Sequence, residues 1–197
     1  MPWNKDNLES LLEQVKTQNY LGRDIYTTPV IFEVKRLYED LLKSQVDNKL
    51  LYQAILILGE ADFRQAKSFV GDFLNSPDSE LRSIAILSVG LYWRLKEFTN
   101  TLKKLVTHDQ EEYIRGEAAV ALGHIYKASK DTNILEFLLK KLKDDTKEFD
   151  NQEEFYSAIL RVWGISSRDI YTIKRNLKSE NDFDWQRIKE IESFCKH

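Results

Sequence analysis

The chain of 197 residues is poor in the residues that cross-link, bend or interrupt a polypeptide. It contains one cysteine, three prolines and seven glycines. Cys195 therefore has no partner for a disulfide within the chain, and a reducing compartment is expected. So little proline and glycine argues against the many tight turns of an all-β protein and favours long helices.

Long apolar runs and an excess of positive charge are also missing. No stretch of about 18 consecutive apolar residues occurs, so no membrane span is predicted, and the first residues, MPWNKDN, do not read as a secretory leader. The 29 basic and 32 acidic side chains give a formal charge of -3 and a pI of about 5.7, unlike a typical nucleic-acid binder. We expect a cytoplasmic protein for which nucleic acid is not the natural partner.

Four segments that end in glycine resemble one another. They are 50–59 (LLYQAILILG), 81–90 (LRSIAILSVG), 114–123 (IRGEAAVALG) and 155–164 (FYSAILRVWG). The glycines are Gly59, Gly90, Gly123 and Gly164, and their spacings of 31, 33 and 41 residues are typical of two-helix repeat units. Five positions before the glycine stands a small residue that lets helices approach closely (Ala54, Ala85, Ala118), whereas Ala158 stands six before. These segments predict the first helices of four helical hairpins.

A second amphipathic segment follows each first helix. These segments are 63–74, 98–106, 134–142 and 170–177, and their apolar residues recur at helical spacing. Further helices are predicted at 5–18, 28–42 and 184–194, where they would cap the ends of a stack. The resulting organisation has capping helices at 1–46, about four repeats at 47–178 and a capping helix at 179–197, within one structural domain.

The second and third repeats carry the signature of a known family. Asp78-Ser-Glu-Leu-Arg82, followed by Ala85 and Gly90, resembles the HEAT repeat, particularly the short bacterial form named after phycobilisome lyase subunits. The segment from Tyr113-Ile-Arg115 to Ala118 and Gly123 is similar to it as well. The resemblance implies an all-α fold, a right-handed α-α superhelix built as a solenoid of HEAT-like hairpins.

The same resemblance assigns structural roles to two pairs of residues. Asp78 and Glu111 would cap the first helices, as their polar side chains at a helix start also suggest. Arg82 and Arg115 would brace the stack toward the neighbouring repeat. The first and fourth repeats depart from this pattern, because Leu51 and Tyr156 occupy the arginine position.

Motifs for catalysis and cofactor binding are not found. His108, His124 and His197 lie far apart without metal-ligand spacing, and no GxGxxG, GxxxxGK[ST] or GxSxG motif occurs. We therefore predict no metal, no cofactor, no catalytic residue and no enzyme. His124 is interpreted as a polar position at a helix end, and acidic pairs such as Glu153–Glu154 as solvated charges near helix ends.

The best functional candidate is a cationic series on the second helices. Its members are Lys103, Lys104, Lys140, Lys141, Lys174 and Arg175, with Lys143 and Lys178 beside them. Second helices line the concave side of HEAT-like stacks, so the series could form a basic ridge that attracts an acidic partner. Ordinary solvated lysines near helix C-termini are the alternative interpretation. Tyr92 and Trp93, at the end of a first helix, are either a binding hot spot or filling between helices.

These observations favour a non-enzymatic scaffold or adaptor that binds an acidic protein surface or segment, and a regulatory subunit or immunity-type inhibitor would fall in this class. The resemblance also implies two alternatives. One is a phycobilisome-lyase-like chromophore or chaperone subunit, which would bind a linear tetrapyrrole. The other is a HEAT-like DNA-binding protein or DNA glycosylase, which the acidic pI opposes. The sequence does not determine the partner or the oligomeric state.

Overall fold

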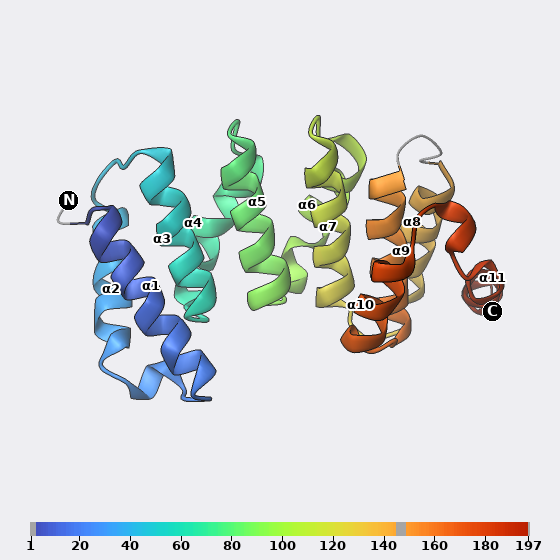
Figure 1. Cartoon of the computed structure of the whole chain (residues 1–197). Coiled ribbons are helices and arrows are strands. Elements are labelled where there is room, and N and C mark those ends of the chain that lie inside the picture. The colour runs from blue at the N-terminus through green and yellow to red at the C-terminus, as the bar shows by residue number, and fades with distance from the viewer. Residues whose placement is uncertain (1–2, 145–148, 197) are drawn as a thin grey trace. The chain divides into compact units, whose positions relative to one another are not determined.

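A computed structural model describes residues 3–144 and 149–196 and shows helices throughout this part of the chain, with no strand in it (Figure 1). The predicted all-α fold is thus confirmed. The chain divides into two compact units, Met1–Trp93 and Arg94–His197. We call them unit 1 and unit 2 and describe each by itself.

In the part of unit 1 that the structure describes there are five α-helices and four short helical turns. They are α1 (Lys5–Tyr20), η1 (Ile25–Thr27), α2 (Val30–Leu41), α3 (Asn48–Glu60), η2 (Arg64–Ala66), α4 (Lys67–Asp72), η3 (Phe73–Asn75), α5 (Ser79–Leu87) and the π-helical turn η4 (Ser88–Tyr92). Helix α3 lies between α1 and α5 and packs against both. Its C-terminal part is apolar on most sides, with Ala54, Ile55 and Leu58 fully buried, so it forms the core of the unit.

The described residues of unit 2 form six α-helices and two 3-10 turns. They are η5 (Lys96–Phe98), α6 (Thr99–His108), α7 (Glu112–Ile125), α8 (Thr132–Asp144), α9 (Phe149–Trp163), α10 (Ser167–Asn176), η6 (Glu180–Asp182) and α11 (Trp185–Cys195). The first helices α7 and α9 pack extensively along each other, while α6 packs against α7 and α8 against α9. A second helix therefore lies against the first helix of the next repeat.

The contact between α7 and α9 depends on two small residues. A Cβ atom added at Gly123 would lie only 2.9 Å from the backbone Cα of Ala158. Both residues are fully buried, so the two helix backbones approach as closely as their atoms allow. The sequence placed Ala158 one position out of register, yet this residue makes the close contact.

The repeat glycines do not share a single structural role. Gly59 faces side chains, since an added Cβ would lie 2.7 Å from the ring of Tyr92. Gly164 has φ +110 and ends α9, where the N–H of Ile165 donates to the carbonyl of Leu160 at 2.9 Å. That bond is typical of a helix terminated by a left-handed glycine. Gly90 is buried within the π-helical turn.

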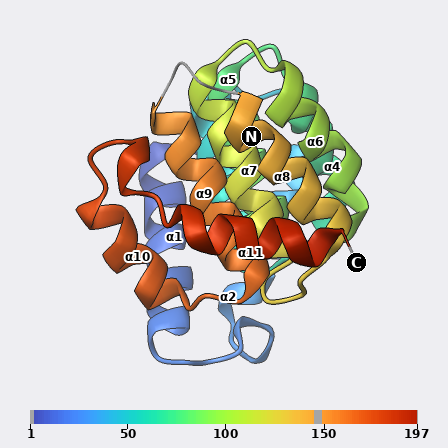
Figure 2. The same cartoon turned by 90° about the vertical axis from the view of Figure 1, so that its right-hand side faces the viewer.

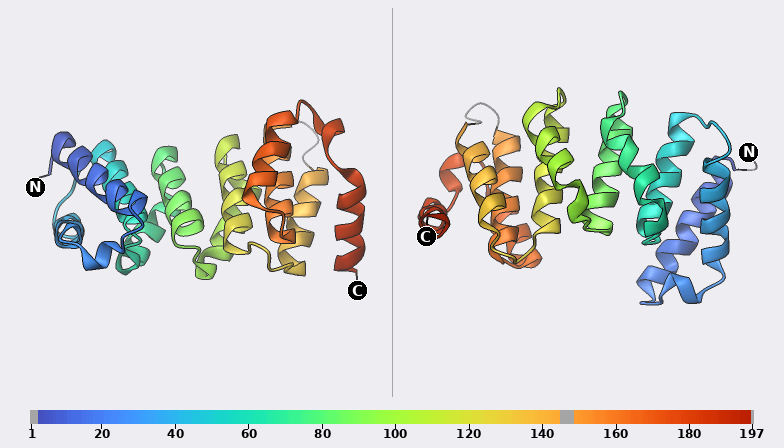
Figure 3. Two further views of the ribbon diagram at one scale, coloured as in Figure 1. Left: turned by 60° about the horizontal axis from the view of Figure 1, so that its bottom comes forward. Right: turned by 180° about the vertical axis from the view of Figure 1, so that it is seen from behind.

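The last second helix, α10, departs from the predicted arrangement. It packs against α9, whereas α11 packs against α8. Figures 2 and 3 show α10 and α8 on opposite sides of α9, with α11 lying across α8. The predicted ridge along α6, α8 and α10 is therefore wrong at its last member, because α11 occupies the place beside α8.

Candidate protein-interaction surface

Helices α6 and α8 of unit 2 carry four lysines whose side chains are exposed or half-buried. Lys103 of α6 places its Nζ 5.1 Å from the ring centroid of Phe137 on α8. Lys140 and Lys141 follow Phe137 by three and four residues and so lie near it on the helix surface. Lys104 is the neighbour of Lys103 and is exposed. We call Lys103, Lys104, Lys140 and Lys141 the basic surface.

The charges of the basic surface are not neutralised by nearby carboxylates. Within residues 3–144 and 149–196, none of the four lysines forms an ion pair. Lys143 differs, because its ammonium pairs with the carboxylate of Glu192 on α11. Helix α11 thus neutralises Lys143 at one edge of α8, whereas Lys140 and Lys141 of the same helix form no ion pair with the described residues.

Lys174 and Arg175 do not belong to the basic surface, because α10 lies on the other side of α9. Lys174 pairs with Glu154 at 2.8 Å and with Glu153 at 3.1 Å. Burial is the largest influence and lowers the pKa of Lys174, but these two carboxylates together raise it above its ordinary value. Glu153 and Glu154 were interpreted as solvated charges, and in the structure they anchor α10 to α9.

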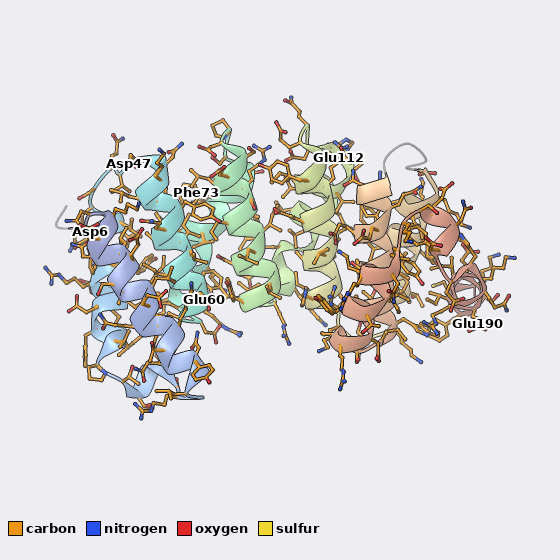
Figure 4. The ribbon with its side chains drawn as sticks, viewed as in Figure 1. Asp6, Asp47, Glu60, Phe73, Glu112 and Glu190 are labelled. Carbon is orange, nitrogen blue, oxygen red and sulfur yellow. The ribbon has the colours of Figure 1, made fainter. Side chains whose placement is uncertain are left out.

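The proposed aromatic hot spot is not available as a pair. Trp93 is 1% exposed, so its ring packs in the interior and is not part of the surface. The hydroxyl of Tyr92 donates to the carboxylate of Glu60, which is labelled in Figure 4, at 2.8 Å. Burial, together with Glu60, raises the pKa of the Tyr92 hydroxyl. The hydroxyl of Tyr92 thus forms a hydrogen bond within unit 1.

The two arginines of the repeat signature make the same contact in both units. Arg82 donates from Nη1 to the carbonyl of Ser76 at 2.9 Å, and Arg115 donates from Nη1 to the carbonyl of Asp109 at 3.0 Å. Each arginine therefore satisfies the backbone of the turn that leads into its own helix. Such a carbonyl would otherwise need a water or another donor.

Only one of the two predicted caps makes the expected hydrogen bonds. The side chain of Asp78 accepts from the backbone N–H of Glu80 and Leu81, and it also accepts from Asn48 of the preceding repeat at 2.7 Å. This bond to Asn48 is the largest cause of the lowered pKa of Asp78. Glu111 stands at the N-cap position of α7 without a side-chain cap bond, because its longer side chain is poorly suited to capping.

Sequence reasoning missed a buried arginine at the end of α9. Arg161 is only 9% exposed, and its Nε and Nη1 have no hydrogen-bond partner in the described structure. Burial lowers its pKa. The signal in the sequence was a basic residue within an apolar helix segment, ILRVW, where a polar residue is unusual.

The described residues contain neither a metal-binding cluster nor a membrane-spanning helix. No group of three or more His, Cys, Asp or Glu side chains lies in an arrangement that would hold a metal ion. No helix in this part of the chain has both the length and the apolar composition needed to cross a bilayer.

The stacked helix pairs, the braced turns and the close-packed small residues define a helical-repeat protein of the solenoid class. The family described as HEAT repeats matches residues 37–123 and 70–159. These two ranges together cover more than half of the chain, so the chain belongs to the HEAT-repeat family. No match was found among curated proteins or among solved structures.

Proposed function

We propose that this HEAT-repeat chain is a protein-interaction scaffold or adaptor whose basic surface binds an acidic surface or segment of another protein. HEAT repeats generally mediate protein–protein interaction. The observation that carries the proposal is a contrast among the described residues: Lys103, Lys104, Lys140 and Lys141 form no ion pair there, whereas Lys143 and Lys174 are paired. A regulatory subunit or an immunity-type inhibitor in the cytoplasm would be a role of this kind, and the resemblance to the short bacterial repeat form stays a prediction.

The basic surface has the chemistry expected for acidic segments. Its ammonium groups stand on helices fixed by a buried core, because Leu138 and Leu142 of α8 and Leu102 of α6 are almost fully buried. A rigid array of like charges attracts acidic partners from solution and selects against basic ones. Phe137 lies within the array and adds apolar contact area beside the charges.

A charge-reversal experiment tests the proposal. Lys104, Lys140 and Lys141 are replaced together by glutamate, and the variant is compared with wild type for capture of proteins from the source lysate and for titration with a poly-glutamate peptide. The expected result is loss of both the captured partner and the peptide. The matched control reverses three exposed lysines elsewhere, Lys35, Lys49 and Lys189, and so makes the same change in net charge.

The control decides how the result is read. If the control variant retains the partner and the peptide, the binding depends on the basic surface. If both variants lose them equally, or if neither does, the basic surface is not the binding site. Raising the salt concentration should weaken the interaction with the peptide, because exposed charges are screened.

A further inference from the structure

A second concentration of positive charge lies at the C-terminal ends of α7 and α9. His124 is in the last turn of α7 and Arg161 in the last turn of α9. The close contact of Gly123 with Ala158 fixes these two helix ends against each other. The positive charges of Arg94 and Lys127 also act on His124. We call Arg94, His124, Lys127 and Arg161 the basic end.

Hydrogen bonds hold the segments of the basic end in place. The N–H of Ala128 donates to the carbonyl of Arg161 at 2.9 Å, so the turn that carries Lys127 is tied to the end of α9. The hydroxyl groups of Thr99 and Tyr126 lie 3.1 Å apart, and the ammonium of Lys96 lies 5.1 Å from the Tyr126 ring centroid. These contacts tie the turn that follows Arg94 to the end of α7.

Charges within the basic end repel one another. Burial is the largest cause that lowers the pKa of His124, and the positive charges of Arg161, Arg94 and Lys127 lower it further, to about 4. His124 is therefore neutral at pH 7, while three cations remain. The negative ends of two helix dipoles together balance roughly one positive charge. The basic end therefore keeps an excess of positive charge.

Arg161 shows that a counter-ion is missing from this group. Its guanidinium is buried, yet Nε and Nη1 donate to no acceptor of the described residues. Glu154 is the carboxylate that raises the pKa of Arg161, and it already accepts from Lys174 at 2.8 Å. A buried charged group without hydrogen bonds is costly, so such groups in proteins are normally paired.

We propose that the basic end binds a phosphate group, with Arg161 as the buried base of the site and Arg94 and Lys127 as its exposed rim. Guanidinium groups suit phosphate because their planar donors match its oxygens. A phosphate group carries a charge of roughly -1.5 to -2 at pH 7, which fits the excess of the basic end better than a single carboxylate does. Neutral His124 supplies a further hydrogen-bonding group, since its Nδ1 is buried and has no hydrogen-bond partner among the described residues.

Calorimetric titration of the full chain with inorganic phosphate at low ionic strength, with acetate as the comparison anion, tests this site. Wild type should bind phosphate saturably and acetate much more weakly. Lys127→Gln and Arg94→Asn alter exposed residues, and each should weaken phosphate binding by at least about tenfold, as expected for loss of one charge-assisted hydrogen bond. Asn is chosen at position 94 because φ is +52 there and Asn tolerates that conformation.

Arg161→Gln should abolish phosphate binding, and circular dichroism shows whether that variant is folded. If it is not, the two rim variants carry the test. Lys189→Gln, at an exposed position outside both the basic surface and the basic end, should leave phosphate binding unchanged. The phosphate site is overturned if wild type does not bind phosphate, or if the rim variants bind it as tightly as wild type and Lys189→Gln do.

The source of the phosphate is distinguished by a second titration with a phosphoserine peptide and its unphosphorylated form. If the phosphopeptide binds, the unphosphorylated peptide does not, and inorganic phosphate displaces the phosphopeptide, the site takes a phosphate group on a protein. If inorganic phosphate binds and neither peptide does, the ligand is a small free phosphate. Equal binding of both peptides through Lys127 and Arg94 would show that the phosphate group is not what the basic end recognises, and would contradict the proposal.

Discussion

Both sides of unit 2 carry basic residues of the predicted series, but the two sides differ in whether those residues form ion pairs. On the side of α6 and α8, Lys103, Lys140 and Lys141 have no carboxylate partner in the described structure. On the side of α10, Lys174 is held between two glutamates of α9. A count of basic residues therefore does not predict a basic surface, because the pairing of each charge decides whether a partner can use it.

The largest expected effect comes from the α7–α9 contact on which both sides depend. Gly123→Ala should lower the free energy of unfolding by about 1–3 kcal/mol, because the new Cβ meets a backbone that cannot yield without moving a helix. Chemical denaturation of the full chain measures this loss. Gly116→Ala is the matched control in the same helix. The atoms nearest to its Cβ would be side-chain atoms of Asn151 and Glu154, at 3.2 Å, so the gain in helix propensity should make that variant neutral or slightly more stable. Equal costs at the two positions would contradict the assigned contact.

The next effect concerns pH and the basic end. Because the pKa of His124 is about 4 in the folded protein and about 6.5 in an unfolded chain, the unfolded state binds more protons between these values. Protonation of His124 therefore has no effect on the free energy of unfolding above pH 6.5. As the pH falls from 6.5 toward 4, that free energy decreases by roughly 1–3 kcal/mol. Unfolding curves recorded from pH 7 to pH 4 measure this loss.

A pair of histidine variants isolates that effect. His124→Gln should remove most of the loss between pH 6.5 and pH 4, whereas His108→Gln, at an exposed position, should leave the pH profile as in wild type. If the two variants show the same profile, the acid sensitivity arises elsewhere in the chain.

A smaller effect is expected from releasing α10. Lys174→Met should destabilise the docking of α10 by about 1 kcal/mol, because Ile170 is the one buried residue of this helix and the ion pairs provide much of the remaining attachment. Hydrogen exchange should become faster in α10 and stay unchanged in α8. Arg175→Met, at an exposed position, is the control and should change neither.

The pH dependence of the same helix provides an independent check. The pKa of Lys174 is raised in the folded protein, so its contribution is complete below the ordinary lysine value of about 10.4 and is lost as the pH rises through the folded value. Protection of α10 in wild type should therefore fall above about pH 10.5. Protection that is constant up to pH 11 would show that the ion pairs do not hold the helix.

The smallest effect on stability is expected at the basic surface. Reversal of Lys104, Lys140 and Lys141 to glutamate should change the free energy of unfolding by no more than about 0.5 kcal/mol, since exposed substitutions away from specific contacts are usually nearly neutral. Thermal unfolding measures the change. A large loss would mean that these lysines are structural, and the loss of binding could then not be assigned to the surface.

Helices could be predicted from the sequence because local rules determine them. The predicted first helix at 114–123 lies within Glu112–Ile125, and the predicted capping helix at 184–194 nearly coincides with Trp185–Cys195. Apolar spacing and capping residues act over a few positions and leave a clear pattern. The segment 63–74 was the least regular, since it forms a short helix between two 3-10 turns.

The placement of α10 could not be predicted, because it depends on a competition between segments. Both α10 and α11 are amphipathic, and the sequence alone does not say which of them packs against α8. Helix α11 buries Ile188 and Ile191, whereas α10 buries only Ile170. The helix with the larger apolar face, α11, therefore packs against α8. As a result α10 lies elsewhere, and Lys174 and Arg175 are not part of the predicted ridge.

The apolar periodicity of the sequence also did not predict which individual polar residues are buried. Trp93 was a candidate contact and is filling, and Arg161 was not considered although it is one of the few buried charged residues. Such residues depend on contacts between helices that are far apart in the sequence. Periodicity identifies the buried face of a helix, but not which polar residue on it lacks a partner.

Lysine footprinting of the complex with the captured partner tests the central claim most directly. Each lysine is acetylated with and without the partner, and the extent of modification is measured by mass spectrometry. We expect protection of Lys104, Lys140 and Lys141, and no change at Lys189 or at Lys178 beyond α10. Protection of Lys178 with full modification of the basic surface would contradict it and would place the partner on the other side of α9.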